Sequence, residues 1–298
     1  MPDIHQFEPL FGSWVLEDEI GRGSYGNVYR ARSDADGVKR WAAVKHISVE
    51  EREDLSVEQQ IRSLNREINI NELFRNEPNI VAYQETAFFN KPRLDGVDVF
   101  IRMELLTTLS HWIKGHLMGE TEVIRLGKEV CLALNALEQV GILHRDVKIS
   151  NIFVDDRGTF KLGDFGVAKS IGSVAYDMTL TGAYNYMAPE IAKGAKVKLN
   201  ADLYSLGIVL YRMMNGGKAP FLAPDSDPSY EEANEAMLRR MNGEPLPPPA
   251  QATAGLSGVI LRACAYDPEE RFETAMEMHE ALQRCLPAPK PWYMFWKS

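Results

Sequence analysis

The chain has 298 residues and an ordinary globular composition, with 45% hydrophobic and 25% charged residues. This composition excludes a disordered or fibrous protein and predicts a packed core. The 33 Lys and Arg residues against 42 Asp and Glu residues give a formal net charge of −9. Because nucleic acids and anionic membranes attract basic surfaces, this balance argues against nucleic acid as a partner and tolerates a basic protein partner.

The cysteines and the first residues indicate a cytoplasmic location. Cys131, Cys264 and Cys285 lie far apart and form no CxxC pair, which favours reduced, buried thiols. The first ten residues lack the basic and apolar regions of a signal peptide. No run approaches the roughly 18 consecutive apolar residues of a membrane span.

The first hundred residues predict a β-rich region interrupted by one helix. The helix is expected over 56–74, where apolar residues recur at helical spacing between charges. Short apolar segments bounded by turn residues predict strands over 14–20, 28–32, 41–47, 81–89 and 97–103.

The pattern becomes mainly helical after Leu106. A hairpin is expected over 152–154 and 160–162. Asn200 is expected to cap a strongly apolar helix over 201–215, closed by two glycines. The remaining helices are expected over 123–137, 229–241, 255–265 and 273–285. A β-rich lobe followed by a helical lobe, with a hinge near 104–108, defines an α+β class.

A glycine-rich segment follows the first predicted strand. Gly21, Gly23 and Gly26 precede Val28 in a GxGxxGxV pattern, in which backbone N–H groups could approach phosphate oxygens. A dinucleotide-binding turn shows similar glycines but opens a helix, whereas here the chain continues as a predicted strand. A plain β-turn remains an alternative for this motif taken alone.

Charged residues then recur in a defined order. Lys45 interrupts an apolar strand, and a buried ammonium needs partners, such as nucleotide phosphates or the carboxylate of Glu67 on the next helix. Further along stand His-Arg-Asp-Val-Lys-Ile-Ser-Asn at 144–151, Asp-Phe-Gly at 164–166 and Ala-Pro-Glu at 188–190.

This set of motifs resembles that of the eukaryotic-type (Hanks-type) protein serine/threonine kinases, and segment 221–249 looks more like the bacterial members. The resemblance implies a bilobal kinase fold with a β-rich N-lobe containing one key helix and a mainly helical C-lobe. It implies a kinase domain over 11–286, with an N-lobe of about 11–104 and a C-lobe of about 108–286. A Pro-rich and aromatic tail follows at 287–298.

The resemblance implies transfer of the ATP γ-phosphate to Ser or Thr hydroxyls of proteins, with Mg²⁺ or Mn²⁺ as the metal. Lys45 would hold the α- and β-phosphates and pair with Glu67. Asp164 and Asn151 would ligate the metal ions. Asp146 would accept the proton of the substrate hydroxyl, and Lys148 would steady the γ-phosphate.

The same resemblance assigns the adenine site. Met103 would be the gatekeeper, and the backbone of Glu104 and Leu106 would hydrogen-bond the purine. The purine would lie between the apolar side chains of Val28, Ala43 and Phe153. In the helical lobe, Arg271 would pair with Glu190.

Two positions depart from the family pattern. Ala183 stands where a Thr usually bridges the catalytic Asp and the Lys two residues beyond it, which keeps a pseudokinase or weakly active nucleotide-binding scaffold as the alternative. Asn71 stands where an apolar residue is usual, so either its amide is hydrogen-bonded or the alignment is shifted by one residue. A small-molecule phosphotransferase is a second alternative, disfavoured by Lys148 and by the expected Glu190–Arg271 pair.

Three further features carry expectations about regulation and partners. Thr179 and Thr181 are the favoured sites of autophosphorylation, because Arg145 precedes Asp146 in the pattern typical of phosphorylation-ordered kinases. Acidic residues over 225–235 form either a solvated face or a site that attracts basic substrates. The tail leaves membrane association, self-docking and truncation of a longer chain open.

Overall fold

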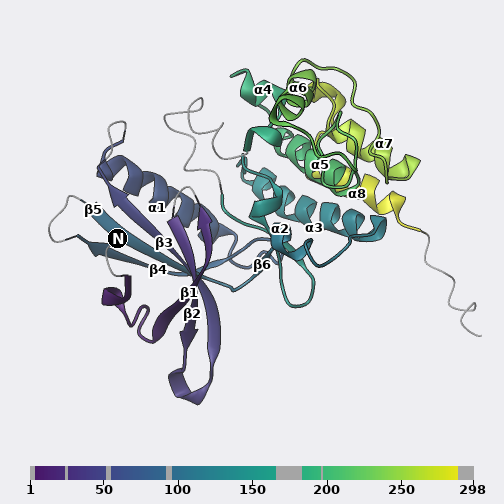
Figure 1. Cartoon of the computed structure of the whole chain (residues 1–298). Coiled ribbons are helices and arrows are strands. Elements are labelled where there is room, and N and C mark those ends of the chain that lie inside the picture. Colours follow the sequence, from purple (N-terminus) through teal and green to yellow (C-terminus); the bar gives the residue numbers. More distant parts are fainter. Residues whose placement is uncertain are drawn as a thin grey trace, which may run out of the picture. The chain divides into compact units, whose positions relative to one another are not determined.

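The chain folds into two compact units, each built from two separate stretches of sequence. Unit 1 comprises residues 1–115 and 144–184, and unit 2 comprises residues 116–143 and 185–298. Figure 1 shows the strands of unit 1 and the helices of unit 2. The computed structural model describes residues 4–23, 26–51, 55–91, 96–165, 183–195 and 197–287.

Unit 1 contains an antiparallel five-stranded sheet with the order β1-β2-β3-β5-β4. Along β3 the side chains alternate between the two faces, as expected for a strand. Val44 is fully buried in one hydrophobic cluster, so its neighbours Ala43 and Lys45 point to the opposite face. The strands are β1 (Trp14–Gly23), β2 (Gly26–Ser33), β3 (Arg40–Glu50), β4 (Tyr83–Asn90) and β5 (Gly96–Met103).

Helix α1 (Val57–Leu73) is the helix expected between the strands. It begins with a capping box, because the Ser56 hydroxyl accepts from the N–H of Gln59 and the Gln59 side chain accepts from the N–H of Ser56. Leu64 packs into a second cluster with Val99 and Ile101 of the sheet. The same cluster contains Val49 of β3, so the helix also packs against the strand that carries Lys45.

Asn71 joins the end of α1 to the start of β4. Its side chain is fully buried, its Nδ2 donates to the carbonyl of Val81 at 2.9 Å, and its Oδ1 accepts from the N–H of Tyr83 at 2.7 Å. Of the two explanations for Asn71, the hydrogen-bonded amide is therefore the one that the structure supports. A buried polar side chain is tolerated when both of its ends are paired.

Strand β4 begins at Tyr83, two residues later than expected from the apolar pattern. The reason is that the N–H of Val81 donates to Leu162, while the N–H of Leu162 donates to Asn79, so this segment pairs with a different sheet. That small sheet contains β7 (Ile152–Val154) and β8 (Phe160–Leu162), as predicted for the hairpin. Strand β6 (Thr107–Thr108) and helix α2 (Leu109–Trp112) were not expected from the sequence.

Unit 2 is helical in the residues that the structure describes. Asn200 stands at the N-cap position of α5, as expected, but its side chain makes no capping hydrogen bond. Its Nδ2 donates to the carbonyls of Pro268 and Phe272. The helices are α3 (Glu120–Gln139), α4 (Pro189–Ala192), α5 (Ala201–Met213), α6 (Tyr230–Met241), α7 (Ala254–Ala263) and α8 (Ala275–Cys285).

The α+β class predicted from the sequence is confirmed. Within the described residues, no helix combines the length and the apolar character needed to cross a membrane. Cys131 and Cys264 are free and buried, and burial raises the pKa of Cys264 to about 12. These two thiols therefore serve as small core residues.

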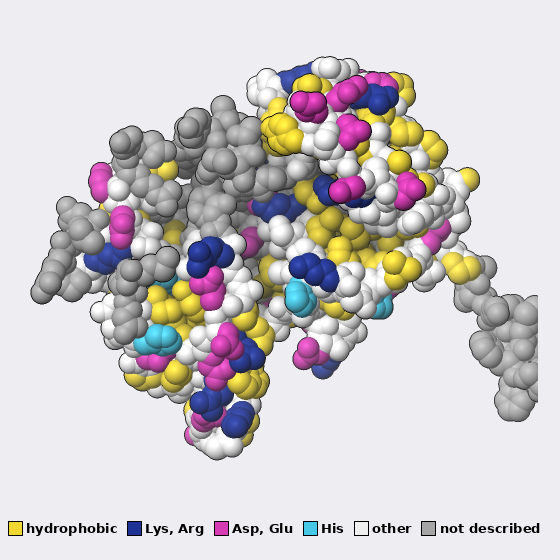
Figure 2. All heavy atoms as spheres, viewed as in Figure 1, with side chains coloured by type: hydrophobic (Ala, Val, Ile, Leu, Met, Phe, Trp, Pro, Cys, Tyr) yellow, Lys and Arg dark blue, Asp and Glu magenta, His cyan; other side chains and the backbone are white. Residues whose placement is uncertain are grey.

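The visible surface mixes charges of both signs (Figure 2). On the first two strands, for example, Arg30 contacts the carboxylate of Asp18 and Arg32 contacts that of Glu17. Ion pairs at exposed or partly exposed positions of this kind contribute little to stability, so the fold depends on its clusters and on buried polar contacts.

Replacing Asn71 with Leu, the apolar type usual at this position, should destabilise the protein. The substitution leaves the carbonyl of Val81 and the N–H of Tyr83 buried without their partner, which costs on the order of 2–4 kcal/mol. Chemical denaturation measures the free energy of unfolding, with Asn65→Leu, an exposed position on the same helix, as the matched control. Equal stability of the two variants would contradict the role given to Asn71.

Candidate active site

The predicted site residues surround one cavity, which lies entirely within unit 1. The cavity has a volume of about 1600 Å³ and is lined by residues between Ile20 and Phe165. Gly23 lies at the end of β1, paired with Gly26 across the hairpin. The other predicted residues line the cavity: Gly21, Gly26, Val28, Ala43, Lys45, Glu67, Met103, Glu104, Leu106, Asp146, Lys148, Asn151, Phe153 and Asp164.

The glycine-rich segment is a β-hairpin between β1 and β2, as the sequence predicted. Gly26 has a φ of +150°, and a Cβ atom there would lie 2.1 Å from the carbonyl oxygen of His46. Only glycine can bring the backbone this close to β3. The hairpin thereby covers the cavity at the strand that carries Lys45.

Lys45 reaches across the cavity to Asp164. Its Nζ lies 2.8 Å from Oδ1 of Asp164, and only 11% of the Lys45 side chain is exposed. Loss of hydration in the cavity opposes ionisation of Asp164, but the charge and hydrogen bond of Lys45 outweigh it and hold the pKa of Asp164 below its ordinary value. The carboxylate is therefore ionised and available to a cation.

Glu67 lies on the cavity side of α1 and is 5% exposed. Its Oε1 accepts a hydrogen bond of 2.8 Å from the hydroxyl of Tyr83. Burial and the charge of Glu67 raise the pKa of Tyr83 well above its ordinary value, so this hydroxyl stays a donor. Pairing of Glu67 with Lys45 stays a prediction.

The segment 144–151 orients a carboxylate with three polar neighbours. Nδ2 of Asn151 donates to Oδ2 of Asp146 at 2.8 Å and to its backbone carbonyl at 2.9 Å. Nζ of Lys148 lies 3.0 Å from the same Oδ2. The backbone N–H of Asp146 donates to Nδ1 of the buried His144, which fixes the tautomer in which Nε2 donates to the carbonyl of Gly163.

The backbone is strained at two positions beside these carboxylates. Arg145 has a φ of +65° and Asp164 a φ of +56°, in the left-handed region that few non-glycine residues adopt. Such strain is typical of functional sites, where it holds side chains in directions that relaxed backbone would not give. Neither position was predicted from the sequence.

Gly163, which precedes Asp164, lets its own backbone lie close to the side chains of Val81 and Phe153. A Cβ atom there would lie 2.8 Å from Val81 and 3.0 Å from Phe153. Its N–H donates to the carbonyl of Asn151, which joins the two segments that carry Asp146 and Asp164.

The predicted hinge is anchored by a residue that sequence reasoning missed. Nζ of Lys161, on β8, lies 2.9 and 2.8 Å from the two carboxylate oxygens of Glu104. The two side chains are only 14% and 25% exposed. Lys161 lies in strand β8, three residues before Asp164. This position close to the Asp-Phe-Gly motif is the sequence feature that could have indicated a role for the lysine.

The donor set fits a divalent cation bound together with phosphates. Asn151 uses its amide nitrogen toward Asp146, so the amide oxygen can face a metal, and Asp164 supplies an ionised carboxylate. No group of three or more His, Cys, Asp or Glu side chains with metal-binding geometry occurs in the described part of the chain. Mg²⁺ typically needs only one or two protein oxygens when substrate phosphates and water complete its shell.

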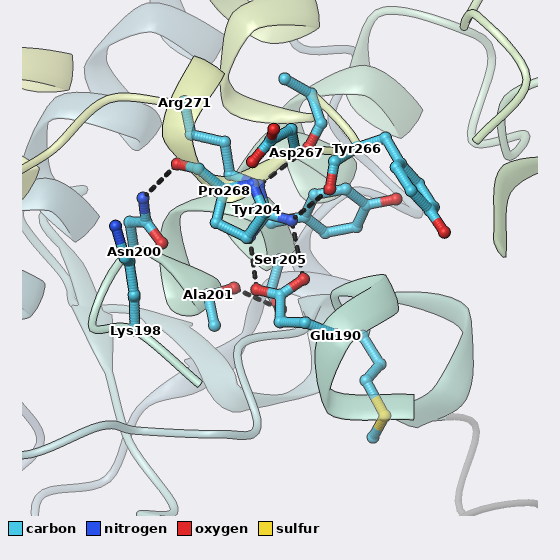
Figure 3. Close-up of polar contacts among 12 residues, drawn as sticks. Glu190, Lys198, Asn200, Ala201, Tyr204, Ser205, Tyr266, Asp267, Pro268 and Arg271 are labelled. Atoms are coloured by element: carbon cyan, nitrogen blue, oxygen red, sulfur yellow. Dashed lines mark hydrogen bonds and ion pairs between the residues drawn. The ribbon is translucent and has the colours of Figure 1, made fainter. Parts of the chain in front are cut away.

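Unit 2 contains the ion pair that the family resemblance implied. Arg271 donates through both terminal nitrogens to the two carboxylate oxygens of Glu190, at 2.6 and 2.7 Å (Figure 3). The Arg271 side chain is fully buried, and it also donates to the carbonyls of Ala265 and Tyr266. A fully paired buried charge of this kind supports a fixed local structure.

Several predicted features lie outside the described residues. They are Gly166 of the Asp-Phe-Gly motif, Thr179 and Thr181, and residues 288–298 of the tail. Ala183 is the first residue of a short 3-10 turn, Ala183–Asn185.

Comparison with known proteins identifies the family. The model of the protein kinase domain matches residues 14–284, so the chain belongs to the protein kinase family. The serine/threonine-protein kinase PknB of Mycobacterium tuberculosis is 34% identical over 287 residues, which cover 92% of this chain and 43% of that protein. PknB of Mycolicibacterium smegmatis is 32% identical with the same coverage.

A further relative comes from another bacterial group. It is the "Probable serine/threonine-protein kinase PknB" of Lactococcus lactis, 30% identical over 270 residues, which cover 87% of this chain and 40% of that protein. The predicted membership of the Hanks-type kinases, with bacterial relatives, is confirmed. The chain spans less than half the length of these relatives.

Breaking the Lys161–Glu104 pair should weaken ATP binding. Lys161→Met removes the cation that holds the hinge carboxylate, and we expect the KM for ATP to rise about 3- to 10-fold with a smaller change in kcat. Glu104→Gln should have a similar effect, and the double variant should be little worse than either single one, because both remove the same contact.

Lys198→Met, which removes an exposed ion pair of unit 2, is the control for this measurement. Additive increases in KM for the double variant would show that the two residues act independently and would contradict the anchoring of the hinge by Lys161.

Proposed function

We propose that this protein transfers the γ-phosphate of ATP to Ser and Thr hydroxyls of protein substrates. The observation that carries the proposal is the arrangement around Asp146, whose carboxylate is held by Lys148 and Asn151 in the same cavity as the Lys45–Asp164 pair. Family membership implies ATP and a divalent metal ion in general. We propose Mg²⁺, with Mn²⁺ able to replace it, and Asn151 and Asp164 as its protein ligands.

Each charged group has a defined part in the proposed reaction. The substrate hydroxyl oxygen forms a bond to the γ-phosphorus while the bond from that phosphorus to the β–γ bridging oxygen breaks, and ADP leaves with the electron pair. The hydroxyl proton passes to Asp146. Lys45 binds the α- and β-phosphates and Lys148 the γ-phosphate, so positive charge lies where negative charge develops. A bound metal ion would neutralise charge on the phosphates.

The adenine site is part of the proposal. Val28, Ala43 and Phe153 line the cavity as apolar surfaces, and the backbone of Glu104 and Leu106 would hydrogen-bond the purine. Met103, also on the cavity wall, would set the depth of the site.

The two alternative functions have less support. The comparisons lend no support to a pseudokinase, because the relatives named above are serine/threonine kinases. The buried Glu190–Arg271 pair supports a protein kinase over a small-molecule phosphotransferase. In the family pattern, small-molecule kinases generally lack this pair.

The partners and the location are also proposals. We propose protein substrates that include the chain itself, with Thr179 and Thr181 as acceptors, and a preference for basic proteins. Glu231 and Glu235 are exposed on α6 and would favour such proteins by charge. A cytoplasmic location is in keeping with the free cysteines.

Asp146→Asn should slow phosphotransfer strongly while ATP still binds. Loss of the proton acceptor lowers the rate by about 10²- to 10⁴-fold, since a general base typically contributes this much. The assay incubates the purified chain with γ-labelled ATP and Mg²⁺ and separates labelled protein. Asp36→Asn, on the loop between β2 and β3, is the control. Label on Asp146→Asn equal to that on the parent would contradict the proposed mechanism.

The same assay on Ala183→Thr tests the weakly active alternative. Gain of the hydroxyl usual in the family should raise the rate by roughly tenfold if its missing hydrogen bond limits the reaction. A parent chain without labelled product, together with an active Ala183→Thr variant, would favour the scaffold function.

A further inference from the structure

Tyr204 of unit 2 contacts two buried arginines. The Tyr204 side chain is 1% exposed, and the guanidinium carbon of Arg271 lies 4.7 Å from the centre of its ring. Figure 3 shows Arg271 beside Tyr204 and bonded to Glu190. The second arginine is Arg240 of α6, whose guanidinium carbon lies 5.6 Å from the same ring and whose Nη1 donates to the Tyr204 hydroxyl at 3.0 Å. Cation–π contacts of this kind are strongest where water is excluded.

The two arginines hold opposite ends of one short segment. Nη1 of Arg240 also donates to the backbone carbonyl of Met187 at 2.9 Å. Arg271 binds the carboxylate of Glu190, three residues further along. The segment 187–190 is therefore attached at both ends to the same tyrosine, through two cations.

Arg240 is not explained by packing alone. The residue is 4% exposed on an otherwise amphipathic helix, and burial of a guanidinium is costly unless its hydrogen bonds are satisfied. A buried Met or Leu would fill similar space, but it could not bond to the Met187 carbonyl. The next residue toward the N-terminus, Arg239, keeps 41% of its side chain exposed and pairs with Glu244 instead.

The attached segment continues toward the predicted catalytic residues along the chain. Four residues before Met187 stands Ala183, at the position where the family usually has the Thr that contacts the catalytic Asp. Among the described residues, those that line the cavity expected to bind ATP all lie between 20 and 165. We therefore expect a change in segment 187–190 to affect the binding and orientation of the acceptor protein and to leave the binding of ATP unchanged.

We propose that Arg240 is a positioning residue for the protein substrate, which acts by fixing the Met187 carbonyl and, with Tyr204 and Arg271, the segment 187–190. This inference rests on the proposed kinase function. Sequence reasoning assigned Arg271 but gave no role to Arg240 or Tyr204. The effect of Arg240 on the reaction is expected through acceptor binding and orientation, without contact with ATP.

The test compares two reactions of the same purified chain. One is phosphorylation of a mixed-sequence peptide pool with a single Ser or Thr, and the other is hydrolysis of ATP by water. Arg240→Met should lower kcat/KM for the peptide pool by about 10- to 100-fold, while the KM for ATP and the rate of hydrolysis stay within about twofold. Arg240→Lys should recover part of the loss because it keeps a cationic donor.

Two further variants keep the test decisive. Arg239→Met, at the adjacent exposed position, should behave as the parent. Tyr204→Phe keeps the ring and removes only the hydroxyl, so it should show the same selective loss of peptide phosphorylation at about 3- to 10-fold, even if Arg240→Met does not fold. Circular dichroism and thermal unfolding identify which variants are folded.

The outcomes separate the inference from the function on which it rests. Peptide phosphorylation by Arg240→Met equal to that by Arg239→Met would overturn the inference, as would a parallel fall in ATP hydrolysis in folded variants, because that result indicates a general structural defect. A parent chain that hydrolyses ATP but labels no peptide would instead overturn the proposed function and, with it, this role of Arg240.

Discussion

The ion pair between Lys45 and Asp164 is the interaction on which the site depends. It joins strand β3 to the segment after β8, across 119 residues of sequence. Nζ of Lys45 lies 2.8 Å from Oδ1 of Asp164, and both residues line the cavity. Asp146 lies close enough for its charge to oppose ionisation of Asp164. Two neighbouring carboxylates tend to share a proton, so each needs a cation to remain charged. Lys45 is this cation for Asp164, and Nζ of Lys148 lies 3.0 Å from the carboxylate of Asp146.

Buried polar contacts hold the elements that carry these charges. Asn71 and Tyr83 fix helix α1 to β4, with Glu67 on the cavity side, and Lys161 fixes the hinge to β8. In each case an unpaired donor or acceptor would be costly inside the fold, so the contact specifies one arrangement. The same principle applies in unit 2, where Arg240 and Arg271 are buried only because acceptors surround them.

The sequence predicted those parts of the molecule that depend on local periodicity or on a familiar motif. The hairpin of β7 and β8 and the Glu190–Arg271 pair agree with expectation. Outside these motifs, the pattern could not predict contacts between segments distant in sequence. Asn200 was expected to cap α5 with its side chain, but its Oδ1 accepts no capping hydrogen bond, and its Nδ2 donates to the carbonyls of Pro268 and Phe272, about seventy residues later. Lys161 likewise reads as an ordinary strand lysine until Glu104 is placed beside it. The strained backbone of Arg145 and Asp164 has no signature in composition or spacing.

The most direct test of the central ion pair is titration of the Asp164 carboxylate by carbon NMR, in the parent chain and in Lys45→Met. The pKa of Asp164 should lie below its ordinary value in the parent and rise in the variant, because burial and the charge of Asp146, which both raise it, then act without the charge and hydrogen bond of Lys45. A lowered pKa contributes stability above the unfolded value of about 3.9, and this contribution is lost as the pH falls through the folded value. The parent should therefore lose more stability than Lys45→Met in that range, with Lys39→Met, at an exposed position, behaving as the parent. An unchanged pKa of Asp164 in Lys45→Met would contradict the account.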